Sequence, residues 1–288
     1  MDRQQELASV RRAYARRLIA SAGIANPGIE AAFATVERER YLGPGPWPIL
    51  CPAGYFSTPD GNPVRVYSDV LIGIIPERGL NNGMPSYHVP LLASAGIRAG
   101  DHVVHIGAGV GYYTAIMAQL AGPTGRVTAI EFDAGLASRA ATNFSHAGNV
   151  QVLQGDGFSM RFDSADVIYV NAGVTHPADI WLDRLNAGGR LILPLTTERI
   201  CLPGEGVSTS HYGAVFRIER AGDKYLAAWI STVALYPCEG GRDDGLEATL
   251  GAAFQKGGWR RVTRLYRTGD LPDERCWLRA ARWALAYD

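Results

Sequence analysis

The chain has 288 residues, of which 47% are hydrophobic and 19% charged, and its 28 basic residues balance 28 acidic ones. These are values of a globular protein long enough to bury a core, and the zero net charge gives no electrostatic reason to expect nucleic acid or an anionic membrane as a partner. No apolar run approaches the roughly 18 residues of a membrane span, and the charged N-terminus lacks the apolar core of a signal peptide. We therefore expect a cytoplasmic protein that acts on a small or peptidic substrate.

The four cysteines, Cys51, Cys201, Cys238 and Cys276, lie far apart and form no CxxC pair. This spacing argues against a zinc site and against a disulfide scaffold, so no metal is expected. We expect the cysteines to be buried free thiols.

The N-terminal residues have the pattern of a small helical cap. Residues 3–22 carry apolar side chains at helical spacing, and a second short helix is expected after Asn26-Pro27. Residues 43–61 are rich in glycine and proline and are interpreted as an irregular connector. Residues 72–76 can form an edge strand that pairs with another chain or one that folds back.

Strands and helices alternate after residue 85. We expect strands at 102–106, 126–130, 150–154, 166–170 and 190–194, and helices at 87–95, 112–120, 135–146 and 178–185. Strands separated by helices of this length indicate right-handed crossovers and a parallel sheet. The predicted class is therefore α/β, a Rossmann-like doubly wound and mostly parallel sheet.

The pattern changes beyond Thr196. Residues 214–220 and 224–236 are predicted to form an antiparallel hairpin that closes one edge of the sheet. A C-terminal α+β extension follows, with a helix at 244–255 and strand-like runs at 260–267 and 276–287, and its Trp259, Trp277 and Trp283 are expected to seek burial. The predicted division is a cap with an active-site loop (1–85), a central domain (86–240) and the extension (241–288).

A glycine-rich loop joins the strand at 102–106 to the following helix. Gly107, Gly109 and Gly111 stand where the backbone turns sharply and helix N–H groups can face a ligand. A dinucleotide fingerprint has its third glycine one residue later, which weakens that interpretation. A tight turn without a ligand is the other alternative. The G-x-G-x-G form resembles motif I of class I methyltransferases.

Two carboxylates follow at the ends of the next strands. Glu131, followed by Phe132, ends the second strand, where a carboxylate can accept both ribose hydroxyls of a nucleoside. Asp156 follows the third strand and can accept a hydrogen bond from an adenine amino group, while Gly157 leaves room for a flat ring. Three features at successive strand ends predict a nucleoside-containing cofactor.

From about residue 10 to 240 the chain resembles the protein-L-isoaspartate O-methyltransferases. The resemblance rests on motif I, on GDGF, on LIASAGIANPGIEAAFATVERERYLG, on LNAGGRLILPL and on VFRIERAGDKYLAAWISTVALYPCEG. It implies an S-adenosylmethionine-binding sheet, a lid of N-terminal elements and methyl transfer to a carboxylate. The three glycines would then hold the methionine part, Glu131 the ribose, and Asp156 with Gly157 the adenine.

The chain departs from the family pattern at two places. His105 stands where the family usually has an acidic residue. The family's G-Q-T-x-S-Q-P stretch, whose serine lies beside the transferring methyl group, reads here GLNNGMPS, so that Asn81 replaces the threonine and Gly83 the serine. We expect Asn82 to orient an acceptor oxygen, with Ser86 or His88 hydrogen-bonding nearby. Alternatively, Asn-Gly is a turn, Ser86 caps the helix beginning at Tyr87, and His88 is structural.

Three functions remain open on the sequence. The first is an S-adenosylmethionine-dependent O-methyltransferase acting on a carboxylate of a peptide or small metabolite. The second is true isoaspartate repair, with Ser86 in the role of the missing serine. The third is a non-catalytic module that retains the nucleoside site and uses its tail as an interaction surface. The sequence does not indicate an oligomeric state.

Overall fold

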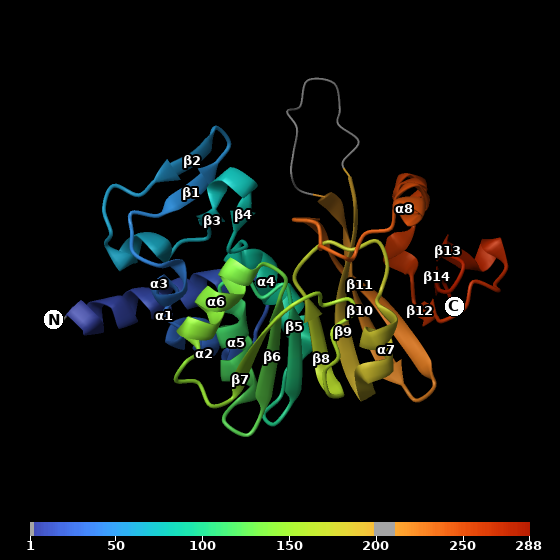
Figure 1. Ribbon diagram of the computed structural model, residues 1–288, viewed down its shortest axis with the longest axis horizontal. Coiled ribbons are helices and arrows are strands. Elements are labelled where there is room, and N and C mark those ends of the chain that lie inside the picture. Colours follow the sequence, from blue (N-terminus) through green and yellow to red (C-terminus); the bar gives the residue numbers. More distant parts are fainter. Residues whose placement is uncertain (1–2, 199–210) are drawn as a thin grey trace. The chain divides into compact units, whose positions relative to one another are not determined.

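The computed structural model describes residues 3–198 and 211–288 (Figure 1). Its chain divides into two units, one of Met1–Asp101 with Ala108–Gln154 and one of His102–Gly107 with Gly155–Asp288. Strands and helices alternate through the middle of the sequence, which confirms the α/β class. The three-part division at residues 85 and 240 stays a prediction.

The first unit contains the N-terminal helices, two hairpins and one parallel strand pair. Its helices are α1 (Arg3–Ala22), α2 (Pro27–Thr35), α3 (Glu39–Leu42), α4 (Pro85–Ala95), α5 (Tyr112–Ala121) and α6 (Ala134–Asn143). Its strands are β1 (Pro48–Cys51), β2 (Gly54–Ser57), β3 (Gly73–Ile75), β4 (Leu80–Asn81), β6 (Arg126–Glu131) and β7 (Val150–Gln154). Short 3-10 turns lie at Pro63–Val66 and Pro76–Arg78.

The two N-terminal helices form as the sequence predicts. Asn26 caps α2 by accepting a hydrogen bond from the Ile29 N–H at 3.1 Å, and Pro27 occupies the first helical turn, where no N–H partner is needed. Tyr14 of α1 meets Phe33 of α2 edge-on, with ring centroids 6.3 Å apart, and both are buried. This aromatic contact holds the cap helices together.

The interpretation of residues 43–61 as an irregular connector is wrong. Strands β1 and β2 pair antiparallel across the two residues Pro52 and Ala53, and Ile49 of β1 bridges to Ile72. Proline and glycine therefore mark the hairpin turn here instead of excluding strands. The second hairpin pairs β3 with β4, so the segment around Ile72 folds back on its own chain.

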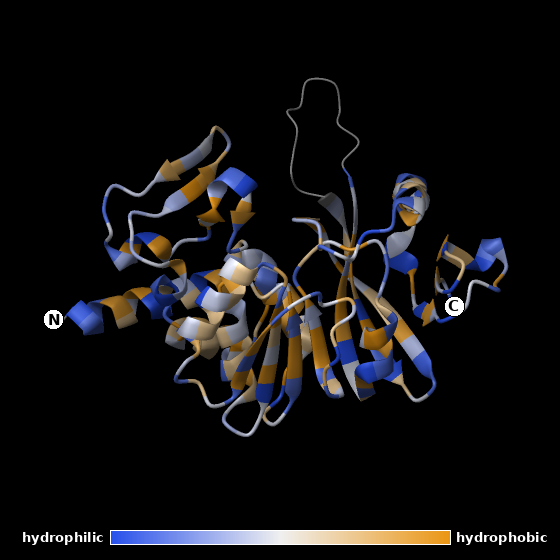
Figure 2. Cartoon of the chain, in the orientation of Figure 1, coloured by the Kyte–Doolittle hydropathy of each residue, from blue (hydrophilic) through white to orange (hydrophobic). Residues whose placement is uncertain are grey.

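The second unit contains most of the sheet. Its strands are β5 (His102–Ile106), β8 (Ala165–Val170), β9 (Leu185–Thr197), β10 (His211–Ala221), β11 (Lys224–Leu235), β12 (Arg264–Tyr266), β13 (Cys276–Arg279) and β14 (Ala284–Ala286). Its helices are α7 (Asp179–Arg184) and α8 (Asp244–Lys256), with short 3-10 turns at Trp259–Arg261 and Asp273–Arg275. The order is β13-β14-β12-β11-β10-β9-β8-β5, with β5, β8 and β9 parallel and the other pairs antiparallel. In Figure 2, hydrophobic residues recur along β8 to β11.

The β10–β11 hairpin forms as predicted but does not close the sheet. Strand β12 pairs with β11, and β14 and β13 continue beyond it, because the run at 276–287 divides into two strands. Trp277 is 3% and Trp283 6% exposed, whereas Trp259 is half-buried. The tail is therefore packed structure, confirming the expectation for two of its three tryptophans.

The thiols divide into two environments. Cys238 and Cys276 are buried as expected, but Cys51 is exposed because it ends β1 at the hairpin turn. Cys201 lies outside the described residues. Across 3–198 and 211–288, the structure contains no helix with the length and apolar character to cross a membrane.

Candidate functional site

Glu131 is fastened to the glycine-rich loop. Strand β6 is buried up to this last residue, and the carboxylate accepts hydrogen bonds from the Gly109 N–H at 2.7 Å and from the Asp133 N–H at 3.0 Å. Burial raises the pKa of the Glu131 carboxyl above its usual range, and those two hydrogen bonds act in the opposite direction. Each carboxylate oxygen keeps a further lone pair, so two hydroxyl groups can still be accepted.

The glycines of this loop differ in what surrounds them. Gly109 has a φ of +57°, and a Cβ there would meet nothing within 4 Å, so open space lies directly above the backbone. Gly111 has a φ of +96°, and a Cβ there would collide with the ring of Phe144. Gly109 thus leaves room for a ligand, while Gly111 allows the packing of α5 and α6. Gly107, in the second unit, lies against the backbone of Asn171.

The residues after Glu131 lead into helix α6, and one of them caps its first turn. Asp133 caps this helix by accepting from the Leu136 N–H at 2.9 Å and forms a 2.6 Å ion pair with Arg78. The Phe132 carbonyl accepts from the Gln154 side chain at 3.0 Å, while the Phe132 ring is 50% exposed. Because its backbone is fixed by this hydrogen bond and its ring is exposed, Phe132 is suited to stack on a flat ligand.

Hydrogen bonds hold both asparagines of this loop: Asn81 is bonded to Gly83, and Asn82 is bonded to Ile72 and Arg38. The Asn81 side chain accepts from the Gly83 N–H at 2.9 Å, and the Asn82 N–H donates to the Ile72 carbonyl at 2.9 Å. The Asn82 Oδ1 atom accepts from the Ile72 N–H at 3.2 Å and from Arg38 at 3.1 Å. Its Nδ2 atom is buried without a hydrogen-bond partner among the described residues. Two donors therefore fix the orientation of the Asn82 amide.

Gly83 stands against an imidazole and a tyrosine. It has a φ of +74°, and a Cβ there would lie 2.6 Å from His88 Nε2 and 3.2 Å from the Tyr113 ring. His88 is fully buried and stacks on Tyr113 at a centroid distance of 3.5 Å. The Tyr113 hydroxyl donates to the Gly83 carbonyl at 3.1 Å. The space beside residue 83, where the family pattern has a serine side chain, is thus occupied by His88.

Ser86 does not act as a helix cap. Helix α4 begins at Pro85, and Ser86 lies in its first turn, where its N–H donates to Asp69 at 2.8 Å. The expectation that Ser86 caps a helix starting at Tyr87 is therefore wrong, because proline already supplies the first helical position. Asp69 places a carboxylate at the positive end of this helix.

His105 is fully buried in β5. Its ring meets Tyr169 edge-on at 5.7 Å, and burial lowers its pKa to about 3. The imidazole is therefore neutral at physiological pH, and it supplies no charge of the kind that an acidic residue would supply there.

Asp156 and Gly157 form a rigid turn in the second unit. Asp156 accepts from the Phe158 N–H at 2.9 Å and from the Ser159 hydroxyl at 2.9 Å. The Gly157 carbonyl accepts from the indole of the fully buried Trp181 at 2.8 Å, and a Cβ on Gly157 would lie 2.5 Å from the Ile106 side chain. Glycine is required here because the turn packs directly on β5.

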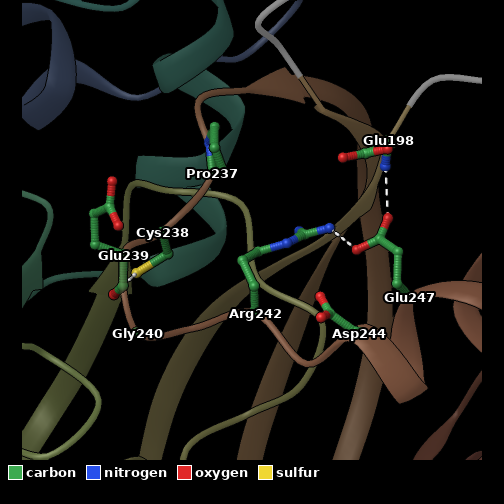
Figure 3. A pocket seen from close by; sticks show the side chains of 8 residues that line it. All are labelled: Glu198, Pro237, Cys238, Glu239, Gly240, Arg242, Asp244 and Glu247. Carbon is green, nitrogen blue, oxygen red and sulfur yellow. Dashed lines mark hydrogen bonds and ion pairs between the residues drawn. The ribbon is translucent and has the colours of Figure 1, made fainter.

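A pocket of about 470 Å³ in the second unit is lined by Glu198 and by residues between Pro237 and Glu247 (Figure 3). Arg242 pairs with Glu247 and donates to the Thr196 carbonyl at 2.9 Å, and Glu247 accepts from the Glu198 N–H at 2.6 Å. Gly240 also lines the pocket, and a Cβ there would lie 2.7 Å from Asp156. The pocket therefore borders the turn that carries the predicted adenine-binding carboxylate.

The structure brings together some of the predicted residues and adds others. Gly109 meets Glu131, and His88 lies beside Gly83, whereas Ser86 is bonded to Asp69. Sequence reasoning missed Arg38 and Tyr113. Arg38 lies in the run VERERY, whose charges resemble a solvated face, so its burial left no sequence signal. Tyr113 lies two residues after Gly111, in the first turn of α5, and that position was the available signal.

The family described as Protein-L-isoaspartate(D-aspartate) O-methyltransferase (PCMT) matches residues 64–202. A protein-L-isoaspartate O-methyltransferase of Ignicoccus hospitalis is 33% identical over 51% of this chain and 66% of its own length. One from Thermotoga maritima is 31% identical over 46% of this chain and 44% of its own length. Protein-L-isoaspartate O-methyltransferase 1 of Rhodopseudomonas palustris is 30% identical over 69% of this chain and 74% of its own length.

Two solved structures share the fold. A protein-L-isoaspartate O-methyltransferase superposes with a TM-score of 0.65 at 20% identity, covering 96% of this chain and 88% of the other. A Plasmodium falciparum protein assigned to the same enzymes, solved in complex with S-adenosyl-L-homocysteine, gives a TM-score of 0.59 at 16% identity, covering 79% and 97%.

Proposed function

The chain belongs to the protein-L-isoaspartate O-methyltransferase family, and we propose that it is an S-adenosylmethionine-dependent methyltransferase that methylates a carboxylate of a peptide or small metabolite. The observation that carries this proposal is the Glu131 carboxylate, held at the glycine loop by the Gly109 N–H. A buried carboxylate beside an open glycine backbone suits a nucleoside, because both ribose hydroxyls can donate to it.

The residues present fit this cofactor in most respects. In the first unit, Glu131 would hold the ribose and the exposed Phe132 ring would cover the adenine. In the second unit, Asp156 and Gly157 are the residues that the family resemblance assigns to the adenine. Gly109 leaves space above the backbone for the methionine part. The neutral His105 is the exception, since the ammonium end of the cofactor would lack one carboxylate.

Methyl transfer to a carboxylate makes few chemical demands on the protein. When bound, S-adenosylmethionine supplies an electrophilic methyl group on a sulfonium. A carboxylate acceptor is already ionised near pH 7, so no general base is needed, and position and desolvation determine the rate. Asn82 and His88 would provide that positioning on the acceptor side. The buried Asn82 Nδ2 atom, which has no hydrogen-bond partner among the described residues, is a donor that supports this role.

Isoaspartate repair is the narrower candidate. Two points support it. The chain belongs to the family that is named for this reaction, and the isoaspartyl carboxylate that such a reaction methylates is already ionised near pH 7. One contact stands against a version that uses a serine at position 83, because His88 occupies the space beside Gly83. We therefore propose that His88 takes the place of the family's serine on the acceptor side.

Two measurements test the proposed function. Isothermal titration with S-adenosylhomocysteine should detect binding, and its absence would remove the proposal. Transfer of a labelled methyl group should then be measured with an isoaspartyl peptide, the matching aspartyl peptide and a set of small carboxylates. Binding without transfer to any of them would favour the non-catalytic module, and transfer to the isoaspartyl peptide alone would favour repair.

A further inference from the structure

Arg38 is a fully buried cation at the centre of the first unit. Its guanidinium donates to the carbonyls of Val66, Ser68 and Val70 at 2.8, 2.9 and 2.8 Å, and to Asn82 Oδ1 at 3.1 Å. Burying a charge is costly unless it is hydrogen-bonded, so a cation with four such acceptors is there to hold them in place. Three of the acceptors belong to the loop before β3, and the fourth belongs to the asparagine before Gly83.

Arg38 also contacts the helix that follows the glycine loop. The guanidinium carbon lies 5.7 Å from the centroid of the Tyr112 ring, a cation–π distance. Tyr112 begins α5 directly after Gly111, and Tyr113 next to it donates to the Gly83 carbonyl. One side chain therefore touches both the asparagine loop and the start of the helix after the glycine loop.

We propose that Arg38 is a positioning residue that acts through Asn82, fixing the loop with Gly83 relative to helix α5. The inference rests on the proposed function, because that loop is assigned to the acceptor and the start of α5 to the cofactor. The chain of contacts is short. Arg38 holds Asn82 Oδ1, Asn82 is paired with Ile72, and Gly83 follows at once.

The role requires arginine in particular. Its planar fork offers five donors at fixed angles, whereas lysine offers three donors around a point charge. Arg38→Lys keeps the charge but cannot reach all four acceptors together. The bond to Asn82 is the longest of the four, at 3.1 Å, and is the one that we expect the variant to lose.

The first test needs neither cofactor nor activity. Amide hydrogen exchange should be compared in the full chain between the wild type and Arg38→Lys. The Ile72 amide, whose acceptor is Asn82 Oδ1, should exchange about tenfold faster in the variant, because its acceptor is no longer fixed. Arg11→Lys is the matched control, since Arg11 is buried in the same unit but contacts Ala34, Glu37 and Glu39 and makes no bond to Asn82 or Ile72 among those that the structure shows. Unchanged exchange at Ile72 in Arg38→Lys would overturn the proposal.

The second test measures methyl transfer to whichever carboxylate the transfer assay under the proposed function identifies as the acceptor. Arg38→Lys and Asn82→Ala should each lower kcat about 10- to 100-fold, as expected for a misplaced acceptor, with S-adenosylhomocysteine affinity changed by less than about threefold. The double variant should lose no more than Asn82→Ala alone, because Arg38 is proposed to act only through Asn82. Asn82→Asp keeps an acceptor oxygen for Arg38 and for the Ile72 N–H but loses the Nδ2 donor, so the Ile72 amide should exchange as slowly as in the wild type while kcat stays low. Additive losses, or fast exchange at Ile72 in Asn82→Asp, would contradict action through Asn82.

The two proposals fail in different ways. If the wild type neither binds S-adenosylhomocysteine nor transfers a methyl group, the proposed function is lost, but the exchange result at Ile72 still decides whether Arg38 fixes the loop. If the wild type is active and Arg38→Lys matches Arg11→Lys in both exchange and kcat, only the role of Arg38 is lost.

Discussion

The Nε2 atom of His88 lies 2.6 Å from the point at which Gly83 would carry a Cβ atom. Any side chain at position 83 must displace this imidazole, and the His88 ring is stacked on the ring of Tyr113. Gly83 and His88 therefore form one unit of packing. A serine cannot be restored at position 83 while His88 keeps its place.

The first prediction concerns Gly83→Ala. The φ of +74° costs a non-glycine residue about 1–2 kcal/mol, and the collision with His88 adds about 1–3 kcal/mol. Urea unfolding should show a larger loss than Gly23→Ala, whose φ is +64° but whose Cβ would meet nothing within 4 Å. In a His88→Ala background the loss should shrink to that of Gly23→Ala. If Gly83→Ala and Gly23→Ala lose the same unfolding free energy, the His88 ring moves aside without an energetic cost.

The second prediction concerns Glu131→Gln. An amide keeps the shape but removes the charge that strengthens hydrogen bonds from hydroxyl groups, which is worth about 1.5–3 kcal/mol, or about 10- to 100-fold in affinity. Isothermal titration with S-adenosylhomocysteine measures the loss. Glu77→Gln, at an exposed position, is the control and should bind as the wild type does. Equal affinity of all three proteins would exclude Glu131 from the site.

The pH dependence of the same affinity follows from burial. Because burial raises the pKa of Glu131, the carboxylate is protonated at a higher pH than an exposed glutamate. Protonation removes an acceptor, so affinity should be constant near neutral pH and fall as the pH decreases through this raised pKa. Titrations in Glu131→Gln should show a flatter profile over the same range. A wild-type affinity that rises on acidification would contradict the assignment.

The third prediction concerns the C-terminal extension. Trp277 is buried, contacts Phe216 at 5.6 Å and Phe254 at 5.1 Å between ring centroids, and donates its indole N–H to the Ala253 carbonyl at 3.2 Å. Trp277→Ala should cost about 3–5 kcal/mol of unfolding free energy. The half-buried Trp259, replaced in the same way, should cost less. A negligible loss at Trp277 would favour a tail that serves as an interaction surface.

The fourth prediction concerns His105 and stability. Its pKa is about 3 in the folded chain against 6.5 ordinarily, so below pH 6.5 the unfolded chain takes up a proton that the folded chain does not. The stability that His105 contributes is present above pH 6.5 and is lost on acidification. Between pH 7 and 5 the wild type should lose about 2 kcal/mol more than His105→Asn. If the unfolding free energies of the two proteins fall by the same amount between pH 7 and pH 5, His105 titrates at its ordinary pKa in the folded chain.

The sequence by itself determined the parts that depend on neighbours in the chain. Hydrophobic runs and glycines placed β5 at His102–Ile106 and β7 at Val150–Gln154 with the bounds that the structure has. Glu131 was found because a carboxylate at a strand end next to a helix start is a local pattern. The residues proposed for the cofactor could be named from the sequence for this reason, since the glycine-rich loop and Glu131 lie at the ends of the buried strands β5 and β6.

Only the tertiary structure decided the acceptor side. His88 beside Gly83, Arg38 on Asn82 and the pairing of β1 with β2 depend on which side chains meet after folding, and Arg38 and Asn82 are 44 residues apart. Charge in a sequence predicts exposure, but a guanidinium can be buried wherever enough carbonyls converge on it. The sequence thus determined which residues are proposed to bind a cofactor, while long-range packing decided which side chains lie beside Gly83 and Asn82.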